Sequence, residues 1–130
     1  MHPNERYILL NYSDAWPPAS MRMELCISPT PTRVEITGFC ELWEGALLCA
    51  RMETTYYQQT ISHRIDQVRV SKADTFECVF QTAPQNPFLP GLYTVYFLLD
   101  FALQPRLVQY AMIRSKTACR QQYSQVFNMA

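Results

Sequence analysis

Histidine is the residue type that most limits the chemistry open to this chain. The sequence of 130 residues has two histidines, His2 near its start and His63 in its middle. A Ser–His–Asp or Cys–His catalytic arrangement would therefore have to use His63. This residue stands between Ser62 and Arg64, beside a positive charge that disfavours its protonated form and with no acid next to it. We expect a surface or strand-end histidine there, and no nucleophilic catalysis.

Carboxyl groups are the other candidates, because acid–base chemistry needs only two of them. Glu41, Glu44 and Glu53 lie on one predicted hairpin, but in its predicted register none of them faces another acid. The loops lack the clustered acids of a calcium site, two histidines are too few for a zinc site built on several, and the three glycines are too far apart for a phosphate loop. We expect no metal, no cofactor and no enzymatic activity.

The five cysteines form an odd set without any Cys-x-x-Cys spacing, which is typical of small buried hydrophobic residues. Cys40 and Cys49 form the pair of most interest. If Glu44-Gly45 is a two-residue turn, the two cysteines lie opposite each other with Cα atoms ~4.5 Å apart. That is near the short end of the range for a disulfide. Without an export signal, two reduced thiols packed side by side are favoured over the bridge.

Composition predicts one folded domain, and the net charge of the chain does not favour a strongly charged partner. The chain is 48% hydrophobic with a formal net charge of zero and scattered basic residues, so neither nucleic acid nor an anionic membrane is an expected partner. Residues 1–10 include Pro3, Glu5 and Arg6 where a signal peptide would be apolar. No apolar run approaches the ~18 residues of a spanning helix. We expect a protein of the cytoplasm without a membrane span.

Strands are predicted along most of the chain. Alternating or β-branched segments indicate strands over 6–12, 21–27, 64–70 and 75–82, while 54–60 is either a loop or an edge strand. One hairpin is predicted over 33–53, with its turn at Glu44-Gly45. A second is predicted from a strand over 92–101, a loop over 102–105 and a return strand over 106–114. In this second hairpin Val95, Phe97 and Leu99 face the core.

Seven or eight strands without a convincing long helix favour an all-β fold, a single-domain antiparallel β-sandwich over residues 1–114. Residues 115–130 are a polar, Gln-rich tail or docking segment. Within it, Cys119, Tyr123, Val126 and Phe127 fall near one helical face. A short docking helix, a swapped strand and a frayed end are the alternatives for this tail.

The run Pro90-Gly91-Leu92-Tyr93-Thr94-Val95 resembles the turn into the penultimate strand of an immunoglobulin domain, with Tyr93 placed as in a tyrosine corner. Cys26 and Trp43 stand roughly where the B-strand cysteine and the C-strand tryptophan would be. An antibody-type domain would have cysteine at position 95, where this chain has Val95. The resemblance implies an immunoglobulin-like topology without the B–F disulfide. It concerns the fold, and a fold does not carry a function.

The predicted hairpin over 33–53 is apolar on both faces, and both faces cannot line one core. One face therefore needs a cover, either from the tail or the Trp16 loop, or from another protein chain. The second predicted hairpin has the same property in milder form. Tryptophan, tyrosine and methionine are enriched at interface cores. We therefore expect a protein interface made first by four residues of the first hairpin and second by two of the other: Phe39, Trp43, Leu48 and Met52, then Tyr96 and Leu98.

These features favour a non-enzymatic protein–protein interaction or assembly module, as a homo-oligomer or with a different protein. A structural part of a virion, or a small adaptor that targets a host protein, fits such a domain. The alternative is a sandwich that binds carbohydrate or another small ligand. Its aromatic platform would come from Trp16, Trp43, Tyr56 and Tyr57, but Tyr56 and Tyr57 are adjacent and would point to opposite faces of a strand.

Overall fold

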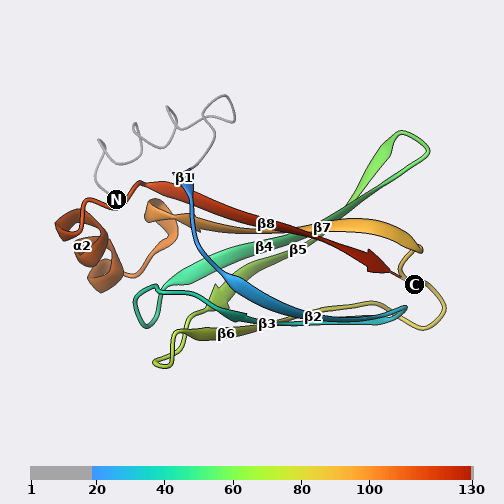
Figure 1. The fold of residues 1–130 in the computed structure, drawn as a ribbon, viewed down its shortest axis with the longest axis horizontal. Coiled ribbons are helices and arrows are strands. Elements are labelled where there is room, and N and C mark those ends of the chain that lie inside the picture. The colour runs from blue at the N-terminus through green and yellow to red at the C-terminus, as the bar shows by residue number, and fades with distance from the viewer. Residues whose placement is uncertain (1–18, 130) are drawn as a thin grey trace.

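A computed structural model describes residues 19–129 as two packed sheets with a short helix at one end (Figure 1). The larger sheet has the order β1-β8-β7-β4-β5 and the smaller one the order β2-β3-β6. Only β1 and β8 pair in parallel in the described part of the chain; the other pairs are antiparallel. The expected all-β sandwich is confirmed. The strand bounds are Ala19–Ser20 (β1), Glu24–Thr30 (β2), Arg33–Phe39 (β3), Leu47–Tyr56 (β4), Gln59–Arg69 (β5), Thr75–Gln81 (β6), Gly91–Asp100 (β7) and Arg120–Met129 (β8).

The core lies between the sheets and is built by strands that bury every second side chain. β3, β6 and β7 show this alternation most clearly, because each carries apolar residues at every second position. The predicted inward positions of β6 and β7 are confirmed. Those inward side chains are Phe76, Cys78 and Phe80 on β6 and Val95, Phe97 and Leu99 on β7.

A close contact between β3 and β6 lies in the core. Gly38 lies directly opposite Phe76 in the register of these two strands. A Cβ atom at Gly38 would stand 2.1 Å from Cζ of Phe76. The Phe76 ring in turn packs on Phe97 of the other sheet, with ring centroids 5.0 Å apart. Glycine is therefore required at this position, because the aromatic ring fills the space that a side chain would occupy.

The predicted hairpin over 33–53 is wrong, because β3 and β4 belong to different sheets. A turn does form at Glu44-Gly45, and Gly45 has the expected positive φ of 85°. It carries the chain from one sheet to the other, with the Gly45 N–H donating to the carbonyl of Val70. Alternation alone could not reveal this crossing, because it describes each strand equally well in either sheet.

The pairing of Cys40 with Cys49 depended on that hairpin and is therefore also wrong. Cys40 is buried just beyond β3, where its N–H donates to the carbonyl of Asp74 at 2.9 Å. Cys49 lies within β4, opposite Leu98 of β7. Both thiols are free. No cross-strand pair of these cysteines exists in the fold.

The segment predicted as a return strand is instead a helix, α2 (Arg106–Arg114), preceded by the single turn η1 (Phe101–Leu103). Val108 and Met112 are buried, and their spacing of four suits a helix as well as a strand. β7 pairs with β8 on one side and with β4 on the other, so Phe97 lies opposite Tyr123 and Ala50 and not opposite a residue of 106–114. The alternatives for the tail were a docking helix, a swapped strand and a frayed end; it forms a strand of the larger sheet over 120–129.

The remaining predictions fall close to observed strands. Residues 54–60 complete a β4–β5 hairpin whose two-residue turn has positive φ at Tyr57 (49°) and Gln58 (65°). The strands predicted over 64–70 and 75–82 correspond to β5 and β6, and the one over 21–27 corresponds to β2. The strand predicted over 6–12 and the Trp16 loop lie outside the described residues.

Tyr93 makes a hydrogen bond of the kind found in a tyrosine corner. Its hydroxyl donates to the carbonyl of Leu89, four residues upstream, at 2.8 Å. The side chain is buried, and this burial raises the pKa of the phenol above its usual value. Tyr93 therefore stays a neutral donor that ties the loop after β6 to the start of β7.

Candidate functional site

The four residues expected to form the main interface do not share a face. Leu48 and Met52 point into the core and are fully buried, which corrects the prediction for both. Phe39 is exposed on the outer side of the smaller sheet, whereas Trp43 is half-buried against the core in the segment between the sheets. The separation of β3 from β4 explains this result, because the four residues were placed together on a hairpin that does not form.

Tyr96 and Leu98 lie on the outer side of the larger sheet, as predicted, and both are half-buried. The guanidinium carbon of Arg51 stands 4.9 Å from the centre of the Tyr96 ring. Arg51 also pairs with Glu53, with Nε and Oε2 2.8 Å apart. Tyr96 is thus already engaged by a neighbouring strand of its own sheet, which leaves less of it for a partner.

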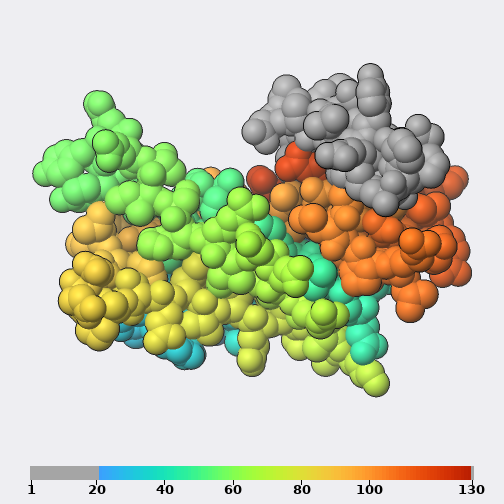
Figure 2. All heavy atoms as spheres, turned by 180° about the vertical axis from the view of Figure 1, so that it is seen from behind, coloured from blue at the N-terminus to red at the C-terminus, as the bar shows by residue number. Residues whose placement is uncertain are grey.

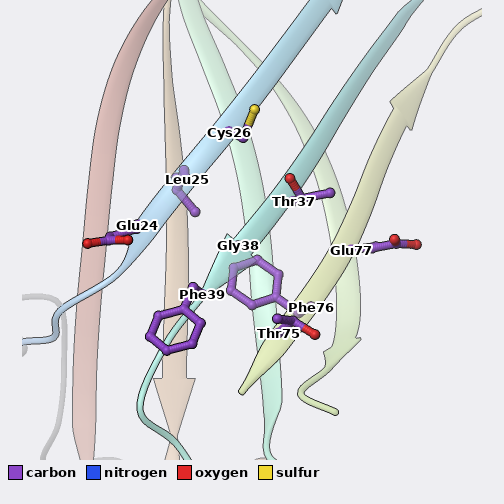
Figure 3. Close-up of a pocket in the computed structure, with 9 residues that line it drawn as sticks. All are labelled: Glu24, Leu25, Cys26, Thr37, Gly38, Phe39, Thr75, Phe76 and Glu77. Carbon is purple, nitrogen blue, oxygen red and sulfur yellow. The ribbon is translucent and has the colours of Figure 1, made fainter. Parts of the chain in front are cut away.

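A shallow trough of about 500 Å³ lies on the smaller sheet around Phe39 (Figure 3). Outward-facing residues of all three strands meet there: Glu24, Phe39 and Thr75 form one row across the sheet, and Cys26, Thr37 and Glu77 form the next. One exposed aromatic ring between hydroxyl and carboxylate groups is a pattern that suits a polar ligand such as a sugar.

Helix α2 carries the densest group of exposed large apolar side chains in the described residues. Leu107 is 80% exposed, Ile113 60% and Tyr110 50%, and Leu103 in the preceding turn is 57% exposed. At 100° per residue, Leu107, Tyr110 and Ile113 lie on the face turned away from the buried Val108 and Met112. The solvent face of α2 therefore carries three large apolar side chains between Arg106 and Arg114, where a surface helix is usually polar. We call Leu103, Leu107, Tyr110 and Ile113 the α2 face.

The buried side chain of Gln104 fixes the start of this region. Its Oε1 accepts from the N–H of Leu47 at 2.7 Å, and its Nε2 donates to the carbonyl of Leu47 at 2.8 Å. The same Nε2 donates to the carbonyl of Asp100 at 2.8 Å. Gln104 thus pairs with the first residue of β4 much as a strand would. These bonds hold the chain that leads into α2 against the end of the larger sheet.

Both ends of α2 have recognisable signals. Pro105 stands at the N-cap with φ −57°, and its carbonyl accepts the first helical bond from Gln109. At the other end Lys116 has a φ of 54°, while the N–H of Lys116 donates to Ile113 and that of Thr117 to Met112. This is the pattern of a Schellman motif. The helix is therefore stopped sharply, and Arg120 can begin β8.

Basic side chains lie beside the α2 face. Arg106, Arg114 and Lys116 are exposed, and positions 101–120 contain no acidic residue. The nearest acid before them in the chain, Asp100, uses its carboxylate to accept the N–H of Ala102 at 3.2 Å. The α2 face is thus an apolar stripe with basic residues along the helix, and the Arg64–Asp66 ion pair lies near Leu103. Figure 2 shows α2 and its neighbouring segments (orange) at the end of the molecule opposite the β4–β5 turn (green).

The titratable groups offer little chemistry elsewhere. His63 points inward from β5 and packs edge to face on Phe88, with ring centroids 4.9 Å apart, and burial lowers its pKa. Burial raises the pKa of Cys40 to about 11 and that of Cys78 to about 12, so both thiols stay protonated at neutral pH. Among residues 19–129, no group of three or more His, Cys, Asp or Glu side chains is arranged to hold a metal ion.

Comparison with known proteins adds no family: no family model matches the sequence, and no curated protein matches it. No helix within the described range is long and apolar enough to span a membrane.

The α2 face was missed in the sequence because 106–114 was interpreted as a strand. Two signals were present. Pro105 is typical of the first turn of a helix, and Leu107, Tyr110 and Ile113 repeat every three residues, which a strand does not explain.

Proposed function

We propose that this chain is a non-enzymatic protein-binding module, and that the α2 face docks on a protein partner with an apolar surface and an acidic rim. The observation that supports the proposal is the exposure of three large apolar side chains on one rigidly attached helix and of Leu103 in the turn before it. Clusters of this kind on a folded surface are typical of protein–protein interaction sites.

The way α2 is attached supports docking as a preformed surface. Val108 and Met112 anchor the helix in the core, and Gln104 ties its start to β4. Little conformational entropy is therefore lost on binding, which leaves more of the apolar contact energy as affinity. The basic residues along the helix add a preference for an acidic partner surface and speed association at low salt.

The test replaces Leu107 and Ile113 together by glutamine, which keeps the helix propensity and removes the apolar area. Because both side chains are exposed, we expect the free energy of unfolding to change by less than about 1 kcal/mol. Affinity for a protein partner captured by the full-length chain should fall at least about tenfold, because two apolar anchors are lost. Urea denaturation measures the first quantity and calorimetric titration the second.

The matched control is the double variant Tyr56→Gln, Tyr57→Gln, which removes two exposed aromatic side chains at the opposite end of the molecule. It should bind like the wild type. The proposal is overturned if no captured partner depends on Leu107 and Ile113, or if their replacement costs several kcal/mol, since the face would then be covered within the chain. Binding of anionic vesicles that is lost in the same variant would assign the face to a membrane surface and would also overturn it.

Carbohydrate binding remains the second candidate, and the trough at Phe39 is the observation that favours it. The trough supplies one exposed ring, that of Phe39, between Glu24 and Thr75 (Figure 3). The other aromatic residues considered for a sugar platform do not gather there: Tyr56 and Tyr57 lie at the β4–β5 turn, and Trp43 is half-buried between the sheets. A glycan array probed with the wild type and with Phe39→Ala distinguishes this candidate from the first.

We also infer that the frame of this module is immunoglobulin-like. The order β2-β3-β6 corresponds to strands A, B and E, and β8-β7-β4-β5 to strands G, F, C and C′. Tyr93 at the start of β7 then takes the place of the tyrosine corner on strand F. In this correspondence Cys26 lies on strand A and Trp43 precedes strand C, so neither takes the position that the sequence suggested for it.

A further inference from the structure

The larger sheet ends in β5 on one side and, beyond the two residues of β1, in β8 on the other, and these two edges differ sharply in how they are protected. At one edge, β5 carries Arg64, Asp66 and Arg69 and has an irregular register where it passes Cys49 of β4. Charges and bulges of this kind discourage pairing with another strand. At the other edge, positions 121–129 of β8 contain no charged residue, no proline and no glycine, and the pairing with β7 runs without a shift.

Within the described residues, the edge of β8 that points away from β7 is paired only at its start. β1 pairs with Gln121 and Gln122, and the chain then leaves the larger sheet to enter β2. From Tyr123 to Met129 no strand of the described region pairs with this side of β8, although β2 of the smaller sheet contacts β8 without pairing with it. The open window therefore has Val126 at its midpoint.

The backbone groups that face this open side can be identified from one bond. The carbonyl of Gln122 accepts from the N–H of Met21 at 3.1 Å, so the backbone of Gln122 points away from β7. Because this direction alternates along a strand, the N–H and C=O groups of Ser124, Val126 and Asn128 point the same way. All three residues are exposed, and Val126 is 59% exposed.

We propose that this edge of β8 pairs with the same edge of a second copy of the chain, antiparallel about a two-fold axis through Val126. The inference goes beyond the proposed function, because it rests on the β8 edge and not on the α2 face. Centred there, Val126 pairs with its own copy, and Ser124 pairs with Asn128 of the other chain. Each is a hydrogen-bonded pair that exchanges two backbone bonds.

This register uses every outward-facing backbone group of the window and stops short of the positions that β1 occupies. If the two-fold axis lay one residue earlier, at Gln125, Asn128 would stand opposite Gln122, whose carbonyl is already bonded. The self-pairing also brings no like charges together, because the window is uncharged. A self-complementary patch of this kind is what a two-fold dimer requires.

The first test is the mass of the full-length chain by light scattering on a size-exclusion column, from about 1 µM to about 1 mM. The wild type should shift from monomer to dimer. Val126→Lys should raise the dissociation constant at least about tenfold, because it loses an apolar contact and sets two like charges across the axis. High salt should reduce this effect. The matched control, Val79→Lys, makes the same replacement on the outer side of β6 and should dimerise normally.

The second test fixes the register by cross-linking in a Cys26→Ser background, which removes the exposed native thiol. Across a hydrogen-bonded antiparallel pair the Cα atoms are ~5.5 Å apart, within the range of a disulfide. Val126→Cys should therefore give a covalent dimer under mild oxidation. Ser124→Cys should not, because its copies would lie four residues out of step, ~13 Å apart.

A chain that stays monomeric at every concentration overturns the inference, as does equal cross-linking of the two cysteine variants. A dimer that survives Val126→Lys but is lost on replacing Leu107 and Ile113 also overturns it, and would assign self-association to the α2 face. The inference is also overturned if the β8 edge binds a different protein while the chain itself does not dimerise.

Discussion

The centre and the rim of this sandwich are both rich in apolar residues, but they are held together in different ways. In the buried core, here called the centre, the Phe76 ring packs on Phe97 and fills the space beside Gly38. At the rim beside α2, the hydrogen bonds of Gln104 fix the chain, and large apolar side chains of the helix remain in solvent. Under the proposed function this difference separates stability from recognition, because the apolar residues at the centre are buried and those on the α2 face are exposed.

The largest effect is expected at the centre, from Gly38→Ala. The new methyl group would overlap the Phe76 ring, which is buried and packed on Phe97, so the ring cannot move without disturbing the other sheet. We expect a loss of about 3 kcal/mol in the free energy of unfolding, at the upper end of overpacking effects. Urea denaturation followed by circular dichroism measures it.

A double-mutant cycle tests the cause of that loss. Phe76→Leu should lower stability in the wild-type background, because it leaves a cavity. In the Gly38→Ala background it should cost much less or even stabilise, since the clash is relieved. Additive effects of the two changes would show that the methyl group and the ring do not compete for the same space.

The centre is also the part that sequence reasoning predicted well. On β6 and β7 apolar residues alternate with others, and each such strand has one buried face whichever strands it pairs with. The inward residues Phe76 and Phe97 could therefore be identified before any topology was known. Which sheet a strand joins is not encoded in its alternation. For this reason β3 and β4 were wrongly placed in one hairpin. The residues of the predicted interface, Phe39, Trp43, Leu48 and Met52, therefore do not lie together.

The rim was predicted poorly, for a related physical reason. Val108 and Met112 fit a strand of period two and a helix equally well, and the helix forms because it can bury both against the end of the core. On β8 the inward side carries Gln121 and Gln125 between apolar residues, which hid the alternation of Tyr123 and Phe127. Pairing with β7 decides the conformation of β8, and pairing partners far apart in the chain are invisible to a local pattern.

A smaller effect is expected at the rim from Gln104→Ala. Truncation leaves the N–H and C=O of Leu47 and the carbonyl of Asp100 without this partner in a half-buried place. We expect a loss of about 2 kcal/mol in the free energy of unfolding, because buried polar groups would go unsatisfied. Urea denaturation measures this loss.

Amide hydrogen exchange locates the effect of Gln104→Ala, which should speed exchange in α2 far more than in β6. The control is Gln109→Ala, which removes a single bond to the carbonyl of Phe101 and should cost less. Equal losses in the two variants, or exchange that rises uniformly over the whole sandwich, would contradict a rim held by Gln104.

The smallest effect concerns His63, at the rim away from α2, where its ring packs on Phe88. Burial lowers the pKa of His63 in the folded chain below the value of about 6.5 expected when unfolded. The folded chain therefore binds this proton less readily, so stability is complete above pH ~6.5 and declines as the pH falls through and below that value. His63→Gln should flatten this part of the profile in urea denaturation between about pH 5 and about pH 8. Since the His63 ring is only half-buried, the slope should be shallow and the loss smaller than that of Gln104→Ala. A profile that keeps its slope without His63 would mean that the contact with Phe88 is indifferent to the charge of the ring, and that this rim, unlike the one at Gln104, is held by apolar packing alone.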